Sequence, residues 1–547
     1  MHVGAAIART LETLGVPRVY TVPGESFLAV LDGLYDTDIT AVVCRHEGGA
    51  TFAAEAHGKA TGRAGVAMVT RGPGAANAKI GVYTAWQDET PLVLFIGLVP
   101  TQDRYRDSFQ EFDATAWFSD ITKGVFILDD PSRASRVVTD AFHLAESGRR
   151  GPVVVGLPED VTEKIFTGDL ALPLAEAHGA VSPTDLDTVA RALETSSRPV
   201  IVEGGQGWTQ EACDAIQEFA ERHQIPVLGD MRASDRIRFD SPANAGWLGT
   251  ARSEYAARLL QDADLVLCIG AKLSDKPTDN FTLRQGTSCR NIVVNADAEL
   301  KGHSGHVSHH VLADPAAFAQ ALPGLDLGPT PDTGEWFDTA RANHERYSTI
   351  PAEGDRFPAL PAGAVDFYHV MECLTSALPE DALCTFGAGS HCAWPQRYFP
   401  TRTYPSMLAT RLGAMGYSVA AALAAKLAHP ERTVVAFTGD GELMMNGQEL
   451  ITAVRYGTPM LVILLDNEQY GTIREFQEKK YPGRVEGTQL VNPDFAAWAS
   501  SMGAWAETVE SNDAVAGAVE RAYGALAEDR VALLHFRVGQ DVATPTA

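Results

Sequence analysis

The sequence lacks any apolar run of about 18 residues, which is the length that a membrane-spanning helix needs. Residues 1–20 instead show an amphipathic helical pattern that is followed by a strand pattern. They have neither the basic start nor the apolar centre of a secretory signal peptide. We therefore expect no membrane partner and a cytoplasmic location.

Basic residues are also scarce. The chain has 44 Lys and Arg against 70 Asp and Glu, which gives a net charge of −26. Binding to the backbone of a nucleic acid needs clusters of positive charge. We therefore expect no nucleic-acid partner.

Cysteine is infrequent, and no two cysteines form a CxxC pair. Most of them lie within apolar stretches, such as residues 265–270. This pattern indicates reduced, buried thiols, as in a cytoplasmic protein. The seven cysteines are Cys44, Cys213, Cys268, Cys289, Cys373, Cys384 and Cys392.

Apolar runs of strand length, in contrast, recur along the whole chain and alternate with alanine-rich helical patterns. Examples are residues 41–44, 65–70, 92–97 and 152–158, with the helical pattern of residues 50–61 between the first two. Near-continuous apolar runs are typical of parallel strands that are covered on both faces. Their alternation with helices predicts βαβ units in open, doubly wound sheets.

A chain of 547 residues is too long for one hydrophobic core. We predict an α/β protein with three doubly wound domains and mainly parallel sheets. The first is expected at residues 1–170, the central one at 185–325 and the third at 363–547. Stretches rich in Pro and Gly within residues 326–362 predict an irregular linker.

Polar residues at the ends of two expected strands give the strongest functional signal. One strand ends at Gly439-Asp440-Gly441 and the next at Asp466-Asn467. The two strands of a right-handed βαβ unit are parallel, so Asp440 and Asn467 are expected at the carboxyl edge of the sheet, where ligands bind. A carboxylate and an amide oxygen suit Mg²⁺, and the glycines allow close approach of a diphosphate. Either motif alone is more often an ordinary turn.

The segment 439–476 resembles the GDG…N motif of thiamin-diphosphate (ThDP) enzymes, and the resemblance extends over nearly the whole chain. In that family the aspartate and asparagine side chains bind Mg²⁺ with a backbone carbonyl two residues past the asparagine. The resemblance implies ThDP and Mg²⁺ as cofactors. It implies Asp440, Asn467 and the carbonyl of Gln469 as metal ligands, with Gly439 and Gly441 beside the diphosphate. The family often has Asn-Asn where this chain has Asp466-Asn467.

Glu47 lies at an expected strand-to-helix junction, where a glutamate is usually exposed or capping. The resemblance implies instead that its carboxyl shares a proton with the aminopyrimidine ring of ThDP and so activates the cofactor.

Met415 resembles the wedge that bends the cofactor, and Gly413 is implied to meet its 4′-amino group; core packing is the alternative for Met415. Because the family's site is assembled from two chains, the resemblance implies a homodimer or homotetramer.

Three weaker resemblances complete the expected site. The segment FGAGSHCAW (386–394) resembles a loop that contacts the diphosphate, with His391 retained and Ser390 in place of a glutamine. RGPGAANA (71–78), which contains Gly74, and FQEFD (109–113), which contains Gln110, resemble segments that line the active-site entrance of acetolactate synthases. An ordinary polar turn is the alternative for each segment.

The resemblance to acetolactate synthase and its relatives implies decarboxylation of a 2-oxo acid, such as pyruvate, followed by carboligation to an acceptor carbonyl. Two departures concern the specific reaction. Phe476 stands where biosynthetic synthases have a tryptophan that shapes the acceptor pocket. Lys272 replaces the arginine of a segment that binds FAD in those enzymes, so FAD is not expected.

Glu25 keeps a second hypothesis open. Pyruvate and phenylpyruvate decarboxylases have a catalytic aspartate in a similar context, and an acid there could relay a proton and favour aldehyde release over ligation. The alternative for Glu25 is a solvated cap of the following helix. A non-ligating 2-oxo acid decarboxylase is therefore the second hypothesis, although the paired histidines of that family are not seen after residues 92–97. A catalytically silent ThDP-binding paralogue is a third, which the presence of Glu47, Asp440, Asn467 and Met415 disfavours.

Overall fold

The computed structural model describes residues 1–285, 290–299, 301–356, 364–540 and 544–545. These residues form two compact units, and both are discontinuous in sequence. The first comprises residues Met1–Ala177, Thr410–Pro430 and Met444–Pro459, and the second comprises His178–Ala409, Glu431–Leu443 and Met460–Ala547. None of the helices in these described ranges is long and apolar enough to cross a membrane.

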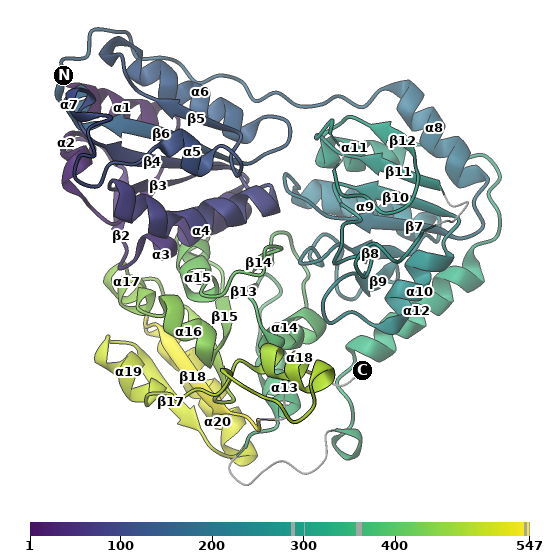
Figure 1. The fold of residues 1–547 in the computed structure, drawn as a ribbon. Coiled ribbons are helices and arrows are strands. Elements are labelled where there is room, and N and C mark those ends of the chain that lie inside the picture. The colour runs from purple at the N-terminus through teal and green to yellow at the C-terminus, as the bar shows by residue number, and fades with distance from the viewer. Residues whose placement is uncertain (286–289, 300, 357–363, 541–543, 546–547) are drawn as a thin grey trace. The chain divides into compact units, whose positions relative to one another are not determined.

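The first unit is built around a six-stranded parallel sheet with the order β2-β1-β3-β4-β6-β5 (Figure 1). Its strands are β1 (Arg18–Thr21), β2 (Thr40–Val43), β3 (Gly65–Val69), β4 (Leu92–Leu98), β5 (Gly124–Ile127) and β6 (Pro152–Pro158). Its helices are α1 (Val3–Thr13), α2 (Leu28–Tyr35), α3 (Glu47–Thr61), α4 (Gly72–Asp88), α5 (Ala114–Phe118), α6 (Ala134–Glu146), α7 (Glu159–Glu163), α15 (Ser418–Ala428) and α17 (Glu449–Arg455). Strands β3, β4 and β6 are buried along their whole length, as near-continuous apolar runs require.

Two further six-stranded parallel sheets belong to the second unit. The central sheet has the order β12-β11-β10-β7-β8-β9. Its strands are β7 (Pro199–Glu203), β8 (Val227–Gly229), β9 (Asn244–Trp247), β10 (Leu265–Ile269), β11 (Arg290–Val294) and β12 (Val307–Val311). The helices around it are α8 (Pro183–Glu194), α9 (Gln210–Arg222), α10 (Glu254–Asp262), α11 (Pro315–Ala321) and α12 (Gly334–Ser348).

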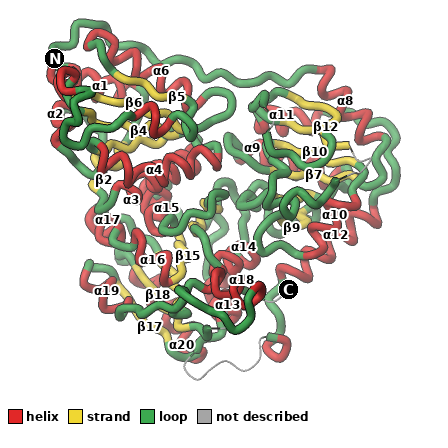
Figure 2. The backbone as a smooth tube through the Cα atoms, viewed as in Figure 1, coloured by secondary structure: helices red, strands yellow, loops and turns green. Residues whose placement is uncertain are grey.

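The C-terminal sheet has the order β14-β13-β15-β16-β18-β17. Its strands are β13 (Leu383–Phe386), β14 (Met407–Ala409), β15 (Val434–Gly439), β16 (Leu461–Asp466), β17 (Trp505–Val509) and β18 (Ala532–Arg537). The helices of this part are α13 (Phe367–Ser376), α14 (Ala393–Tyr398), α18 (Gly471–Lys480), α19 (Phe495–Ser501) and α20 (Asn512–Ala527). Helix α16 (Asp440–Asn446) begins in this part, and its residues from Met444 belong to the first unit. Figure 2 shows the alternation of strand and helix in both units.

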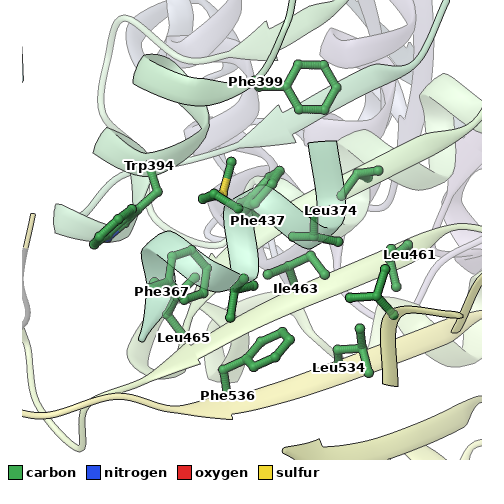
Figure 3. Close-up of a cluster of buried hydrophobic side chains, with 14 of the residues drawn as sticks. Phe367, Leu374, Trp394, Phe399, Phe437, Leu461, Ile463, Leu465, Leu534 and Phe536 are labelled. Atoms are coloured by element: carbon green, nitrogen blue, oxygen red, sulfur yellow. The ribbon is translucent and has the colours of Figure 1, made fainter. Parts of the chain in front are cut away.

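The core of the C-terminal part lies where one face of its sheet meets α13, α14 and α20. Alternate residues of β16, Leu461, Ile463 and Leu465, point into this core together with Phe536 of β18 (Figure 3). The ring of Trp394 packs edge-on against Phe367, with 5.0 Å between the ring centroids. This packing fixes β15 and β16, whose carboxyl ends carry the polar residues of interest.

The expected fold class is confirmed, because each of the three sheets is parallel and is flanked by helices. The expectation of an irregular linker at residues 326–362 is wrong in part. The fifteen-residue helix α12 lies within it, because Trp336, Phe337 and Ala340 give this polar stretch an apolar side that packs on the central sheet. Residues 357–362 of this stretch lie outside the described ranges.

The described cysteines agree with the expectation of reduced thiols. Cys44, Cys213, Cys268, Cys384 and Cys392 are free and buried, and Cys373 is free and half-buried. Burial raises the pKa of the Cys268 thiol to about 12, which makes it unreactive. Cys289 lies outside the described residues.

Candidate active site

The ends of β15 and β16 meet at one edge of the C-terminal sheet, as the sequence predicts. The two strands are parallel neighbours, and Gly439 pairs with Leu465. Asp440 and Asp466, which come directly after this pair, therefore lie at the same level of the sheet edge. The side-chain nitrogen of Asn492 donates hydrogen bonds to Oδ2 of Asp440 and to Oδ1 of Asp466, at 2.8 Å each. One amide group therefore bridges two buried carboxyl groups.

The two carboxyl groups have different environments. Burial, together with the nearby charge of Asp466, raises the pKa of Asp440 to about 6, although the hydrogen bond from Asn492 opposes the shift. Burial also disfavours the charge on Asp466, but hydrogen bonds from His535 and from the Glu468 N–H outweigh burial and lower its pKa. A buried carboxylate beside a second one fits a divalent cation, which would compensate the charge of both.

Asn467 and Gln469 occupy a tight turn after β16. Glu468 between them has a positive φ of 54°, which turns the chain sharply. The Tyr470 N–H donates to the carbonyl of Thr488 at 2.8 Å, and the Leu490 N–H donates to the carbonyl of Glu468 at 2.8 Å, so the turn is held on both sides. No described residue forms a hydrogen bond with the buried Oε1 of Gln469. The turn thus offers amide and carbonyl oxygens beside the buried carboxylates, which fits Mg²⁺.

Two glycines lie close to His391, and a third lies close to Asn467 and Ser390. A Cβ atom on Gly439 would lie 2.9 Å from Nδ1 of His391, and one on Gly389 would lie 2.7 Å from the same atom. A Cβ atom on Gly471, at the start of α18, would lie 2.9 Å from Nδ2 of Asn467 and 3.1 Å from Oγ of Ser390. His391, Asn467 and Ser390 therefore lie around a glycine-lined surface. Such a surface fits a diphosphate, which needs close approach to backbone N–H groups.

His391 is itself fixed by a buried acid. Its Nε2 lies 3.0 Å from Oε2 of Glu442, and both side chains are buried. Burial opposes a positive charge on the ring, but Cys392 and the hydrogen bond with Glu442 outweigh this effect and raise the pKa of His391. A cationic imidazole here would favour an anionic ligand.

The described residues contain no cluster of three or more His, Cys, Asp and Glu side chains that could hold a metal ion.

Glu47 lies in the first unit as the first residue of α3. It does not act as the helix cap, because Nδ1 of His46 accepts the hydrogen bond from the Gly48 N–H in that role. Oε2 of Glu47 accepts a hydrogen bond from Nδ2 of Asn77 at 2.9 Å. A Cβ atom on Gly74 would lie 3.6 Å from Oε1 of Glu47, so the structure brings Gly74 and Glu47 together.

The loop before Glu47 is held by Glu449 of α17. The backbone N–H groups of Arg45 and His46 both donate to Oε1 of Glu449, at 2.9 and 3.1 Å. Burial raises the pKa of Glu449, and the hydrogen bonds from Thr452 and these N–H groups oppose the shift. Glu449 therefore fixes the strand-to-helix turn that presents Glu47.

Glu25 and Gln110 lie near the start of α4 in the same unit. Oε1 of the exposed Glu25 side chain lies 3.0 Å from NH1 of Arg71, and the buried guanidinium of Arg71 also pairs with Glu159. The carbonyl of Gln110 accepts a hydrogen bond from the Gly72 N–H at 3.1 Å. No side-chain cap bond is found at the start of the 3-10 helix Glu25–Phe27 or of α2, so Glu25 is an ion-pair partner and not a cap.

Gly413 and Met415 precede α15 in the first unit. Gly413 is exposed with a φ of 70°, and Met415 is half-buried, so Met415 is not a fully buried core residue. Gly416 follows with a φ of 86°. The segment is an irregular turn that offers backbone groups and one apolar side chain to solvent.

Four residues that sequence reasoning missed contribute to these sites. Asn492, His535, Glu449 and Arg71 reach their partners through contacts between segments that are far apart in sequence. Arg71 and Glu449 lie within quoted segments, RGPGAANA and residues 439–476, but neither residue was singled out there. Asn492 and His535 lie in none of the quoted motifs.

The chain matches three family models in order along its length. Residues 1–117 match "Thiamine pyrophosphate enzyme, N-terminal TPP binding domain", residues 186–322 match its central domain and residues 387–536 match its C-terminal TPP binding domain. Two of these models are named for binding ThDP, and their matched residues include Glu47 in the one and Asp440 in the other.

Similar proteins cover nearly the whole chain. The acetolactate synthase large subunit of Lactococcus lactis is 30% identical over 91% of this chain and 86% of its own length. The probable acetolactate synthase large subunit of Methanocaldococcus jannaschii is 31% identical over 93% and 88%, and the isozyme 2 large subunit of Escherichia coli is 29% identical over 98% and 95%.

The chain belongs to the ThDP-dependent enzymes of the acetolactate synthase family. As a ThDP enzyme it has both regions that the family models associate with the cofactor: Glu47 lies in the N-terminal TPP-binding region, and Asp440 and Asn467 lie in the C-terminal one.

Proposed function

We propose that this ThDP enzyme uses Mg²⁺ to decarboxylate a pyruvate-like 2-oxo acid and to ligate the remaining fragment to an acceptor carbonyl, as an acetolactate synthase does. The observation that carries the proposal is the sheet edge at which Asp440 lies beside the Asp466-Asn467 turn, bridged by Asn492. The similarity to acetolactate synthase large subunits over more than nine-tenths of the chain supports the choice of reaction.

Each part of the site has a role in this proposal. Asp440, Asn467 and the carbonyl of Gln469 would hold Mg²⁺, which would bind the diphosphate. His391 would stand beside the diphosphate, together with the glycines that line the surface around it. When bound, ThDP supplies a carbon nucleophile and an electron sink for the carbon next to the substrate carbonyl.

Glu47 would share a proton with the pyrimidine ring of the cofactor. Asn77 donates a hydrogen bond to Oε2 of Glu47. The other carboxyl oxygen, Oε1, lies beside Gly74 and would face the nitrogen of the pyrimidine ring. Gly413 would meet the 4′-amino group with its backbone, and Met415 would support the bent cofactor. In this family the site is assembled from two chains, so that Glu47 and the diphosphate site act on one cofactor molecule. We therefore propose a homodimer or homotetramer, which light scattering on purified protein tests.

A second candidate function is a decarboxylase that releases an aldehyde without ligation. The ion pair between Glu25 and Arg71 favours it, because this pair lies near the entrance segment of Gln110 with the acid exposed to solvent. A carboxyl group that takes up a proton from solvent could pass that proton to the product carbon. Glu25 and Gln110 are therefore proposed to act on the substrate rather than on the cofactor.

The central sheet does not favour FAD. The carboxylate of Asp230 accepts hydrogen bonds from the Met231 N–H at 2.7 Å and from the Lys272 N–H at 3.3 Å, so two N–H groups at the strand ends are already paired. A Cβ atom on Gly205 would lie 2.6 Å from the carbonyl of Gly270, so the two glycine loops pack on each other. We propose that activity needs no flavin, and the visible absorbance of purified protein tests this.

A panel of 2-oxo acids with ThDP and Mg²⁺ tests the main proposal, with products identified by mass spectrometry. We expect consumption of pyruvate or a close analogue with acetolactate-type products, and a loss of at least about 100-fold in turnover for Glu47→Gln. Aldehyde alone as product would favour the second function. Unchanged turnover in Glu47→Gln would refute both and favour the silent ThDP-binding paralogue, whereas no ThDP binding in Mg²⁺ buffer would refute all three.

A further inference from the structure

A buried cluster of three charged residues lies in the first unit, away from the residues that would touch the cofactor. Lys59 of α3 pairs with Glu55 of the same helix, at 3.0 Å, and with Asp88 at the end of α4, at 2.6 Å. All three side chains are almost fully buried. Burial raises the pKa of Glu55 while the charge of Lys59 opposes this shift, so the cluster sets one cation against two buried carboxyl groups.

Such a cluster is not explained by stability alone. Ion pairs that are removed from water lose hydration energy that their attraction roughly repays, and a well-packed apolar set is often as stable. In some proteins buried charges fix one conformation, and the partners of the remaining carboxylate oxygens indicate which conformation that is here.

The carboxylates of the cluster bind both ends of one short segment. Oδ1 of Asp88 accepts a hydrogen bond from the Arg411 N–H at 2.8 Å. Oε2 of Glu55 accepts one from the hydroxyl of Tyr417 at 2.7 Å. The ring of Tyr417 also packs edge-on against Phe52 of α3, with 5.5 Å between centroids.

The segment between these anchors contains Gly413 and Met415. It has no helix or strand of its own, and its glycines at 413 and 416 adopt positive φ angles. Inside the segment, the carbonyl of Gly416 accepts a hydrogen bond from Nδ2 of Asn446 at 3.1 Å. An irregular turn of this kind keeps one conformation only through such outside contacts.

We propose that Glu55, Lys59 and Asp88 are positioning residues that hold residues 411–417 in the conformation that receives the cofactor. Lys59 holds the two carboxylates in place by its ion pairs. The carboxylates in turn hold Arg411 and Tyr417, which precede and follow Gly413 and Met415 in sequence. Because α3 also begins with Glu47, the same helix fixes the activating acid and the support for the pyrimidine ring. This inference rests on the proposed binding of ThDP.

Tyr417→Phe is the test variant, because it removes one hydroxyl and keeps the ring that packs on Phe52. Thr90→Val is the matched control: the Thr90 hydroxyl donates to Oε1 of the same Glu55 at 2.8 Å, and it forms no hydrogen bond with residues 411–417. Both variants remove one hydrogen bond to one buried carboxylate. We expect the dissociation constant for ThDP in Mg²⁺ buffer, measured by tryptophan fluorescence, to rise about 10-fold or more in Tyr417→Phe and less than about 3-fold in Thr90→Val.

Amide hydrogen exchange gives a second readout. Peptides that cover residues 410–417 should exchange faster in cofactor-free Tyr417→Phe than in the wild type, and at the wild-type rate in Thr90→Val. If Tyr417→Phe does not fold, Asp88→Asn takes its place, since it keeps the side-chain volume and an oxygen for Arg411 but removes the charge opposite Lys59. The same rise in the ThDP dissociation constant is expected.

The outcomes separate the two proposals. If the wild type does not bind ThDP, the proposed function fails. If the wild type binds it, and folded Tyr417→Phe binds it equally well or loses no more affinity than Thr90→Val, the cluster has only a structural role and the positioning inference is wrong.

Discussion

Nε2 of His535 lies 2.9 Å from Oδ2 of Asp466, although 69 residues separate them in sequence. The pair links the central strand β16 to its neighbour β18. Nδ1 of the same ring lies 3.1 Å from Oγ1 of Thr508 on β17, so the imidazole spans three strands. The turn that follows Asp466 carries Asn467 and Gln469, and its position therefore depends on β17 and β18 as well as on β16.

Replacement of His535 by Leu should destabilise the C-terminal part of the chain. The buried carboxylate of Asp466 would lose a hydrogen-bond partner, which costs about 1–3 kcal/mol in the free energy of unfolding. Urea denaturation followed by circular dichroism measures this loss. Thr508→Val should cost less, since it leaves the contact with Asp466 intact, and equal losses in the two variants would contradict the assigned role of His535.

Replacement of Asp440 by Asn should weaken Mg²⁺ binding while preserving the shape of the site. Loss of outer-shell partners of a metal typically lowers affinity about 10- to 100-fold, and loss of a direct carboxylate ligand should lower it at least as much. The Mg²⁺ concentration that gives half-maximal ThDP binding measures the effect. Asp513→Asn, an exposed position on α20, is the control, and an unchanged Mg²⁺ requirement in Asp440→Asn would exclude Asp440 as a ligand.

Mild acid should destabilise the protein through two buried histidines. Burial lowers the pKa of His344 to about 4 and that of His57 to about 4. An unfolded histidine titrates near pH 6.5, so the unfolded chain binds more protons between about pH 6.5 and 4. The neutral rings thus contribute their full stability above about pH 6.5, and this contribution, on the order of 3 kcal/mol for each ring, is lost as the pH falls towards 4.

The His344→Leu variant tests this dependence. Its free energy of unfolding should change less steeply between pH 6.5 and 4 than that of the wild type, as measured by urea denaturation across the range. His306→Leu replaces an exposed histidine and should keep the wild-type slope. An unaltered slope in His344→Leu would show that the ring is protonated in the folded state.

Glu25→Gln should change the partition between products. If Glu25 passes protons to the product carbon, the variant should release several-fold less aldehyde relative to ligated product, with little change in the KM for ThDP. Gas chromatography of both products from pyruvate measures the ratio. Glu159→Gln removes the other partner of Arg71 and serves as control; equal shifts in both variants would assign the effect to Arg71 instead.

The sequence predicted those parts of the fold that depend on local pattern. Apolar runs such as residues 92–97 and 152–158 became β4 and β6 because a strand buried on both faces needs an uninterrupted apolar run. Helix α12 was missed because the stretches on either side of it are rich in Pro and Gly, while its apolar side is set by only a few residues that pack on the central sheet.

The candidate site was predictable where its residues follow strand ends. Gly439, Asp440 and Asn467 stand in such places, and the parallel order of β15 and β16 brings them to one edge. Asn492, Glu449 and the carboxylates around Lys59 could not be inferred in the same way. Their partners lie on other elements, and single-residue contacts across a fold leave no periodic trace in the sequence.

The chain crosses between the two compact units several times in its last third. Helices α15 and α17 belong to the first unit. Strand β15, which lies between them in sequence, and strand β16, which follows α17, belong to the second. A polypeptide cut after residue 177 would lack α15, whose small, buried residues pack along α3. Neither unit is thus formed by one continuous stretch of sequence. During synthesis, the first unit therefore cannot be completed until residues near 459 have emerged from the ribosome.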